Sequence, residues 1–367
     1  MPVAPLFTPV AVGPLRLANR TAVAPMTRTS ATGEGLATAQ MARYYGDFAR
    51  GGFGLVICEG TFIDDSAAQG YLTQPGIVTE AQAAAWKAVV DEVHEAGAAV
   101  FLQLQHAGAI AQGRPQGGQN VGPSAVQPKG EQLSIYKGAG PWGTPREITR
   151  EEIGQVVADF AASALRAQSA GFDGVEIHGA NGYLLDQFFT AYTNERTDEY
   201  GGDIRNRVRL NEEIVRAVRL AVGPTYPVGI RLSQSKVNDF DYTWPGGEDD
   251  AKVVFRLLEA AGASFFHLTE HDITQPVFGS GQTLAGLAKR FATVPVIANG
   301  GLDDPAVAAA AVAGGAADIV ALGKPALANP DWPVRARAGA PLDEFDFEQL
   351  LPLATLDNAE AWRAARG

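Results

Sequence analysis

The sequence predicts a single (β/α)8 TIM barrel, and three observations lead to that fold. Short β-branched runs alternate with longer helical patterns along almost all of the 367 residues. Eight such runs can be distinguished, and eight strands close this kind of barrel. No Gly-x-Gly-x-x-Gly follows the first run, so an open doubly wound sheet is the less favoured alternative. We expect residues 1–367 to form one domain.

The predicted strands are apolar runs bounded by turn residues, which is typical of a parallel sheet buried on both faces. The segments between them are rich in alanine and have helical spacing. The strands are Thr21–Ala24, Phe53–Cys58, Ala99–Leu104, Gly174–Ile177, Val228–Leu232, Phe265–Leu268, Val294–Ala298 and Ile319–Leu322. The helices include Glu80–Ala96, Arg150–Ala170, Arg207–Ala221, Glu248–Ala261 and Asp304–Ala313.

Polar residues and glycines mark where several helices begin and end. Thr79 is followed by Gln82, and Thr149 by Glu152, which is the spacing of a capping box. Four helices end in an Ala-Gly pair, where glycine accepts a left-handed conformation without a Cβ clash. These pairs are Ala96-Gly97, Ala170-Gly171, Ala261-Gly262 and Ala313-Gly314.

Two segments interrupt the alternation of strands and helices. Residues 7–17 contain Pro9, Gly13 and Pro14, and they predict a β-hairpin that closes the bottom of the barrel. Residues 107–147 are rich in Gly, Pro and Gln and form a long excursion after the third strand. Loops after barrel strands lie on the face that carries active sites, so we expect this excursion to be a loop or lid there.

Composition and charge restrict the possible functions. The net charge is 29 − 41 = −12 without a run of Lys and Arg, which disfavours a nucleic-acid partner. The single cysteine, Cys58, lies in an apolar run and excludes an intramolecular disulfide. No signal peptide is evident, and no apolar stretch reaches the roughly 20 residues that cross a bilayer. We therefore expect a cytoplasmic protein with no membrane partner.

Three polar side chains follow the fourth strand in the segment His178-Gly-Ala-Asn181-Gly-Tyr183. An imidazole, an amide and a phenol can together bind a carbonyl-type oxygen and deliver a proton. This segment therefore predicts chemistry on a polarised small molecule.

Gln103 and Arg231 lie within apolar strands, where each needs a polar partner because an unpaired buried polar group costs about 1–3 kcal/mol. A polar side chain on a neighbouring strand could satisfy Gln103, and a barrel carboxylate such as Glu176 could pair with Arg231. His267 also lies on an apolar strand, where a core histidine is favoured over a ligand.

Glycines follow the last two strands, in Asn299-Gly300-Gly301 and Gly323-Lys324. Loops at these positions of a (β/α)8 barrel often bind phosphate, because glycine lets backbone N–H groups approach and lysine adds positive charge. We expect a phosphate-binding site there.

Together these motifs resemble the Old Yellow Enzyme family of FMN-dependent ene-reductases, over nearly the whole chain. Thr27, where another branch has cysteine, places the chain nearer the classical branch. The matching segments are Leu17–Arg28, Gln103, His178–Tyr183, Asn194–Gly202, Arg231, Gly300-Gly301 and Gly323-Lys324.

The resemblance implies non-covalent FMN at the top of the barrel. Pro25, Met26 and Thr27 would line the isoalloxazine, and Gly60 would let the ring approach the backbone. Gln103 would bond the pyrimidine edge of the ring, and Arg231 would stabilise negative charge near N1 and O2. The glycines and Lys324 would hold the FMN phosphate.

The resemblance also implies the chemistry. His178 and Asn181 would bind the activating oxygen of an activated alkene, flavin N5 would supply hydride, and Tyr183 would protonate the α-carbon. NADPH or NADH would reduce the flavin, and the enzyme would be a monomer or homodimer.

Two positions depart from the family pattern. Lys324 stands where arginine is usual, which keeps the charge but loses the bidentate fork. Gln105 stands where an aromatic residue is common, which predicts a wider and more polar substrate pocket. The C-terminal residues 353–367 lack the tyrosines of many members, so no role is transferred to them.

Two other functions compete with this interpretation. One is a non-redox lyase or isomerase that acts on a phosphorylated substrate, which would place a lysine or paired carboxylates at the strand ends. The other is a non-catalytic flavin-binding barrel, which is disfavoured because His178, Asn181 and Tyr183 are all present.

Overall fold

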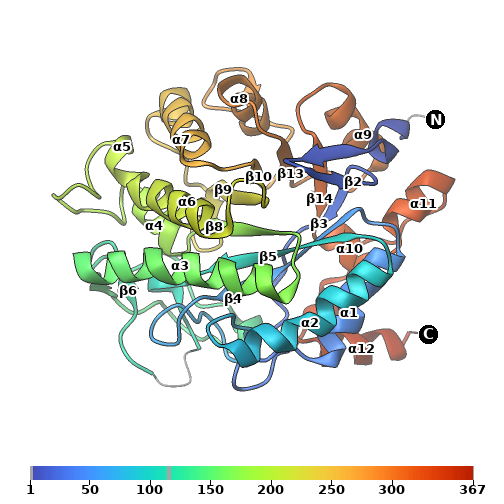
Figure 1. Ribbon diagram of the computed structural model, residues 1–367, viewed down its shortest axis with the longest axis horizontal. Helices are drawn as coiled ribbons and strands as arrows, with labels where there is room; N and C mark the ends of the chain where they lie inside the picture. The colour runs from blue at the N-terminus through green and yellow to red at the C-terminus, as the bar shows by residue number, and fades with distance from the viewer. Residues whose placement is uncertain (1–2, 114–116, 367) are drawn as a thin grey trace.

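The computed structural model describes residues 3–113 and 117–366, and it contains a closed barrel of eight parallel strands (Figure 1). Each strand pairs with its neighbours in chain order, and the last pairs with the first. The predicted fold is therefore confirmed. The strands are β3 (Thr21–Val23), β4 (Leu55–Phe62), β5 (Ala99–Gln105), β8 (Gly174–Asn181), β9 (Val228–Lys236), β10 (Phe265–Thr269), β13 (Val296–Asn299) and β14 (Ile319–Leu322).

Helices surround the barrel and bury their apolar faces against the outer faces of its strands (Figure 1). Both predicted capping boxes are present, at Thr79 and Thr149. The helices around the barrel are α1 (Ala39–Arg50), α2 (Glu80–Glu95), α3 (Arg150–Ala170), α6 (Arg209–Val222), α7 (Gly247–Ala261), α8 (Leu284–Phe291) and α9 (Pro305–Ala313). Shorter helices are α4 (Leu184–Phe189), α5 (Ile204–Arg207), α10 (Lys324–Ala328), α11 (Trp332–Ala338) and α12 (Leu356–Ala364).

Some boundaries differ from the prediction. β8 and β9 each extend four residues past their predicted ends, to Asn181 and Lys236, because backbone pairing continues after the apolar runs stop. Gly314 caps α9 with φ −78°, so the expected left-handed stop is wrong there; Gly315 takes the left-handed conformation with φ +72°.

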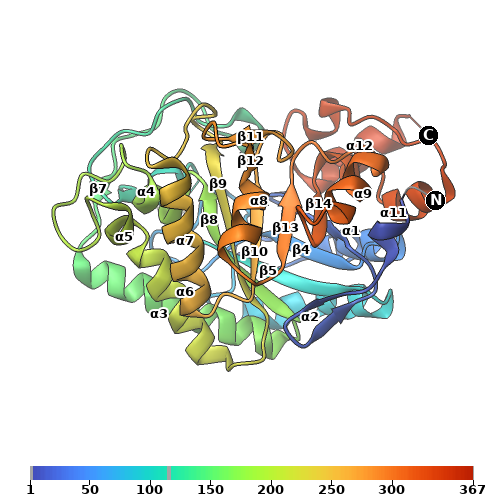
Figure 2. The same ribbon diagram turned by 90° about the horizontal axis from the view of Figure 1, so that it is seen from above.

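The N-terminal hairpin closes one end of the barrel, as predicted. Its strands β1 (Val10–Val12) and β2 (Leu15–Leu17) pair antiparallel, and Val12 and Leu17 pack into the apolar barrel floor. Figure 2 shows this hairpin, in blue, at the end of the barrel opposite the short strands β11 (Pro276–Val277) and β12 (Gln282–Thr283).

Two aromatic rings fill the floor of the barrel. Phe101 and Phe265 lie with ring centroids 5.4 Å apart. Glycines provide the space for them, since a Cβ at Gly174 would lie 2.7 Å from the Phe101 ring and one at Gly229 would overlap Phe265. The interior of the lower barrel is thus a packed apolar core.

The excursion at residues 107–147 begins where β5 ends, and its residues 114–116 lie outside the described ranges. It contains the 3-10 turns η2 (Gly108–Ile110) and η3 (Ser134–Tyr136) and the short strands β6 (Val121–Gly122) and β7 (Arg146–Glu147). Several contacts fix it to distant parts of the chain. Lys129 pairs with Asp239 at 2.7 Å, and the Ala354 amide donates to Ile135 O at 2.9 Å.

None of the helices in the described ranges combines the length and the hydropathy that crossing a membrane requires.

Candidate active site

The barrel interior changes from apolar to polar toward its C-terminal end. Every second residue of a strand faces the interior, and the inward-facing residues become polar along the strands. Two residues after Phe101, Gln103 enters the interior from β5; Glu176 enters from β8, and His267 enters from β10 two residues after Phe265. Gln103 Nε2 donates to Glu176 Oε1 at 2.7 Å, and His267 Nδ1 lies 2.7 Å from Glu176 Oε2. The expected polar partner of Gln103 on a neighbouring strand is confirmed. His267 belongs to this buried network, although its Nε2 has no partner among the described residues.

Arg231 lies above this layer on β9 and does not form the salt bridge to Glu176 that the sequence allowed. Its Nη2 donates instead to Asn299 Oδ1 at 2.8 Å, while Gln103 and His267 bond the two oxygens of Glu176. Arg231 is 5% exposed, and its Nε has no hydrogen-bond partner within the described chain. A buried guanidinium with an unused donor needs an acceptor or an anion.

His178 enters the interior from the same strand as Glu176 and is also buried. Burial lowers its pKa well below the usual value, and the charges of Arg231 and His267 lower it further. The imidazole is therefore neutral at pH 7. Its Nδ1 makes no hydrogen bond to any described residue, and its ring lies 4.8 Å from the Tyr183 ring.

The loop from Asn181 to Tyr183 is shaped by two left-handed residues, Asn181 at φ +63° and Gly182 at φ +86°. Asparagine tolerates this conformation better than most residues, and glycine adopts it freely. Gly182 N donates to Asp186 Oδ2, and its carbonyl accepts from Gln187 Nε2, both at 2.7 Å. Side chains of α4 thus bond both the amide and the carbonyl of Gly182, which fixes the loop.

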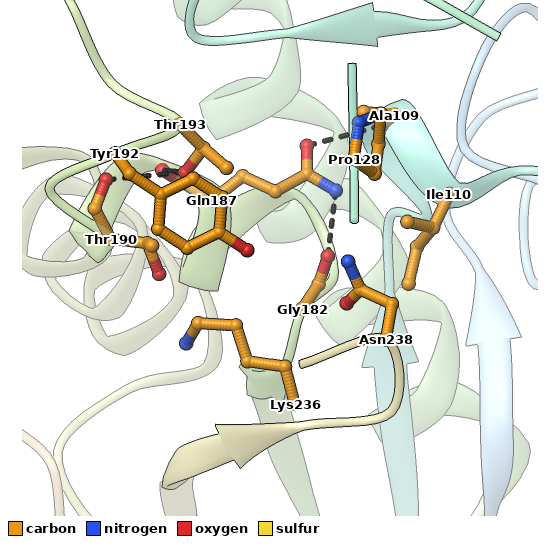
Figure 3. Close-up of a pocket in the computed structure, with 10 residues that line it drawn as sticks. All are labelled: Ala109, Ile110, Pro128, Gly182, Gln187, Thr190, Tyr192, Thr193, Lys236 and Asn238. Carbon is orange, nitrogen blue, oxygen red and sulfur yellow. Dashed lines mark hydrogen bonds between the residues drawn. The ribbon is translucent and has the colours of Figure 1, made fainter. Parts of the chain in front are cut away.

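A buried ion pair supports this loop from behind. Lys236 Nζ lies 2.8 and 2.9 Å from the two oxygens of Asp186, and both side chains are almost fully buried. Lys236 and Gln187 line a small cavity (Figure 3). Its volume of about 10 Å³ has room for about one water molecule. A larger hollow of about 190 Å³ lies between α1 and α12, outside the barrel.

Tyr183 is 6% exposed, and its hydroxyl lies 2.7 Å from the hydroxyl of Tyr71. Burial raises the pKa of Tyr183, while the Tyr71 hydrogen bond and Arg231 act in the opposite direction. Tyr183 therefore keeps its proton at neutral pH.

The turn after β3 contains Pro25, Met26 and Thr27, which are all half-buried. Buried Glu59 holds the next residues, because its Oε2 accepts from Arg28 N at 2.8 Å and from Thr29 N at 3.3 Å. Burial raises the pKa of Glu59 to about 7.

Gly60 and Gln105 occupy the same region of the barrel mouth. A Cβ at Gly60 would overlap Gln105 Oε1, so the glycine makes room for this amide. Gln105 is buried, and its Nε2 has no partner among the described residues. A Cβ at Gly60 would also lie 3.4 Å from Gln103 Oε1.

The predicted phosphate-site residues meet at the ends of β13 and β14. Gly300 and Gly301 have φ +119° and +66°, and a Cβ at Gly300 would overlap Glu270 O, so glycine is required there. Gly323 caps α10 and lies against Met26, since a Cβ there would be 3.6 Å from Met26 Sδ. Lys324, the first residue of α10, is exposed.

The structure adds site residues that the sequence analysis did not identify. Asn299 bonds Arg231, and Tyr71 bonds Tyr183. Tyr136, from the excursion, stacks on Tyr71 with ring centroids 4.5 Å apart. The position of Asn299 at a strand end was a usable signal, whereas Tyr71 and Tyr136 lie in loops without a periodic pattern.

Two unpaired donors at the barrel mouth are compatible with a bound flavin. Arg231 Nε and Gln105 Nε2 are buried and have no hydrogen-bond partner among the described residues. Unused buried donors are costly, so they indicate a bound group with several acceptor atoms.

Comparisons with known proteins agree with this geometry. The model of the NADH:flavin oxidoreductase / NADH oxidase family matches residues 5–343. A putative 12-oxophytodienoate reductase 2 of Oryza sativa subsp. japonica is 40% identical, over 93% of this chain and 89% of its own length. A probable flavin mononucleotide-dependent alkene reductase of Leishmania infantum is 36% identical, over 93% of this chain and 92% of its own length. The solved structure of an old yellow enzyme homologue from Zymomonas mobilis has a TM-score of 0.86 at 32% identity, over 96% of this chain and 99% of that chain.

Proposed function

The chain belongs to the NADH:flavin oxidoreductase / NADH oxidase family, and from that premise we propose that it is an FMN-dependent ene-reductase with the site residues described above. It reduces the activated C=C bond of α,β-unsaturated carbonyl or nitro compounds at the expense of NADPH or NADH. The resemblance to Old Yellow Enzyme agrees with the relatives, while the non-redox lyase or isomerase has no support among them.

One observation supports the proposed site: buried polar nitrogens without partners among the described residues lie above an apolar barrel floor, near a buried phenol. Arg231 Nε, His178 Nδ1 and Gln105 Nε2 all lack partners within the described residues. Arg231 suits the electron-rich edge of a flavin, because a cation there stabilises negative charge on the reduced ring.

The remaining flavin contacts follow from position. Pro25, Met26 and Thr27 would line the ring beside Gly60, and Gln103 would offer its free amide oxygen, since one N–H of its amide is bonded to Glu176. Gly300, Gly301, Gly323 and Lys324 would hold the phosphate at the ends of β13 and β14.

Bound FMN would supply the hydride chemistry that links NAD(P)H to the β-carbon of the alkene. Neutral His178 and Asn181 donate hydrogen bonds to the activating oxygen of the substrate, which draws electron density from the double bond. Tyr183 gives its proton to the α-carbon. Its raised pKa keeps that proton available at neutral pH.

We propose that the whole chain forms one FMN-binding domain, that it is cytoplasmic, and that it is a monomer or homodimer. Its net charge of −12 supports the absence of a nucleic-acid partner.

The purified protein tests the cofactor directly. We expect a yellow protein that releases FMN on denaturation and converts cyclohexenone to cyclohexanone with NADPH or NADH. A colourless protein that does not bind added FMN would exclude this function.

A further inference from the structure

The excursion brings a third tyrosine to the proton donor. Tyr136 ends η3, and its ring packs on that of Tyr71 with centroids 4.5 Å apart and planes inclined by 44°. Tyr71 in turn shares a hydrogen bond with Tyr183. We propose that Tyr136 is a positioning residue, which keeps Tyr71 in place to assist proton donation by Tyr183. This inference rests on the proposed function.

The direction of the hydrogen bond between the two buried phenols decides what Tyr71 does. When Tyr183 gives its proton to the substrate, it cannot also donate to Tyr71, so Tyr71 must be the donor and Tyr183 the acceptor. That bond stabilises the phenolate left on Tyr183 and lowers its pKa against the effect of burial. Tyr71 therefore makes Tyr183 a stronger acid, provided that the Tyr71 ring keeps its orientation.

The chain fixes the backbone of Tyr71 but leaves its ring to be oriented by packing. Its amide donates to Gln74 Oε1 at 3.3 Å, and its carbonyl accepts from Gln69 Nε2 at 3.0 Å. Tyr136 provides one face of that packing, because its ring lies within stacking distance of Tyr71, in the cluster that also contains Ile110 and Trp142.

Tyr136 is held in turn by contacts to three separate segments. Its hydroxyl donates to Thr27 O at 3.3 Å, beside the proposed flavin ring. Gln112 Nε2 donates to Tyr136 O at 3.2 Å, and the preceding residue, Ile135, accepts from Ala354 N at 2.9 Å. Docking of the excursion thus determines where Tyr136 lies, so the excursion is part of the machinery that delivers the proton.

The test measures the two half-reactions of the FMN-loaded enzyme separately, by rapid mixing with NADPH and then with cyclohexenone. Tyr136→Leu should slow the alkene-reducing half-reaction about tenfold. The alkaline limb of the pH–rate profile of that half-reaction should move to higher pH, since Tyr183 becomes a weaker acid. Flavin reduction by NADPH should not change. Tyr136→Phe keeps the ring and the two backbone contacts of residues 135 and 136, and it loses only the long 3.3 Å bond to Thr27 O. It should therefore stay within about twofold of wild type in both half-reactions. Gln112→Leu removes an anchor and should act like Tyr136→Leu.

Tyr226 offers a matched control, because its hydroxyl also donates to a backbone carbonyl, that of Phe172, at 2.7 Å. Tyr226 precedes β9 and therefore lies at the opposite end of the barrel from the site. Tyr226→Leu should lower stability without moving the pH profile of either half-reaction. Combining Tyr136→Leu with Tyr71→Phe should slow the reaction no more than Tyr71→Phe alone.

A wild-type rate and pH profile in both Tyr136→Leu and Gln112→Leu would overturn the inference, as would fully multiplicative effects in the double variant. A wild-type protein that binds FMN but reduces no alkene would overturn the proposed function itself, and the inference with it.

Discussion

Tyr183 combines burial with a single strong hydrogen-bond partner. Its hydroxyl lies 2.7 Å from that of Tyr71, and burial raises its pKa. His178 shows the opposite effect, since burial and the positive charge of Arg231 keep its imidazole neutral. The site therefore holds a protonated phenol beside a neutral imidazole at pH 7, which suits a proton donor next to a neutral hydrogen-bond donor.

Replacement of Tyr183 by phenylalanine should separate hydride transfer from proton transfer. We expect Tyr183→Phe to bind FMN and to accept hydride from NADPH at the wild-type rate, while alkene reduction slows about 100-fold or more. Rapid-mixing measurements of the two half-reactions check this. Unchanged alkene reduction would remove Tyr183 from the mechanism.

The oxygen-binding pair can be tested without turnover. We expect the double variant His178→Ala, Asn181→Ala to bind a para-substituted phenol at least about tenfold more weakly, because two hydrogen bonds to the phenol oxygen are lost. Titration of the long-wavelength charge-transfer absorbance measures this affinity. Equal affinity in the variant and the wild type would place the substrate oxygen elsewhere.

At the scale of elements, the C-terminal ends of β8 and β9 carry the catalytic loop. β8 ends at Asn181, just before Gly182 and Tyr183, and β9 ends at Lys236, whose ammonium pairs with Asp186 under the loop. The two strand ends and the first turn of α4 thus fix the loop together.

Loss of one partner from this buried pair should be costly. Lys236→Met leaves the Asp186 carboxylate buried without a cation, so we expect the free energy of unfolding to fall by about 3–5 kcal/mol. Adding Asp186→Asn should recover part of that loss. The exposed pair Lys87–Asp91 is a matched control, where Lys87→Met should cost less than about 1 kcal/mol. Denaturant unfolding measures both losses. Equal losses for the two lysine variants would mean that the buried pair contributes no more to the free energy of unfolding than the exposed pair.

At the scale of the whole molecule, buried carboxyl groups link stability to pH. Burial raises the pKa of Glu59 from 4.5 to about 7, and that of Glu270 also to about 7. A group whose pKa is higher in the folded state contributes stability that is complete below its unfolded pKa and is lost as pH rises through the folded pKa.

We therefore expect the wild-type protein to lose stability between about pH 5 and about pH 8, in part through Glu59. Glu59→Gln has no charge to bury, so the stability of this variant should fall less over the same pH range. Glu270 should account for part of the loss that remains. Thermal unfolding at a series of pH values checks this. Parallel curves for the two proteins would show that Glu59 does not titrate in the folded state near pH 7.

Much of the fold could be read from local patterns, because β-branched runs, capping residues and glycine stops act within a few residues of each other. The capping box at Thr79 and the hairpin at residues 7–17 are examples. The partner of Arg231 could not be predicted, since it depends on which side chains meet across the barrel, and Asn299 lies 68 residues away in the sequence. Tyr136 was missed for a related reason: a residue in a long loop reaches its position through contacts distant in sequence.

The proposed ene-reductase activity is tested most directly by the absorbance spectrum of the purified protein in the absence of oxygen. We predict that NADPH or NADH bleaches the flavin spectrum, and that cyclohexenone then restores it with formation of cyclohexanone. A protein that contains FMN but is not bleached by either nucleotide, or is not reoxidised by the enone, would contradict the account.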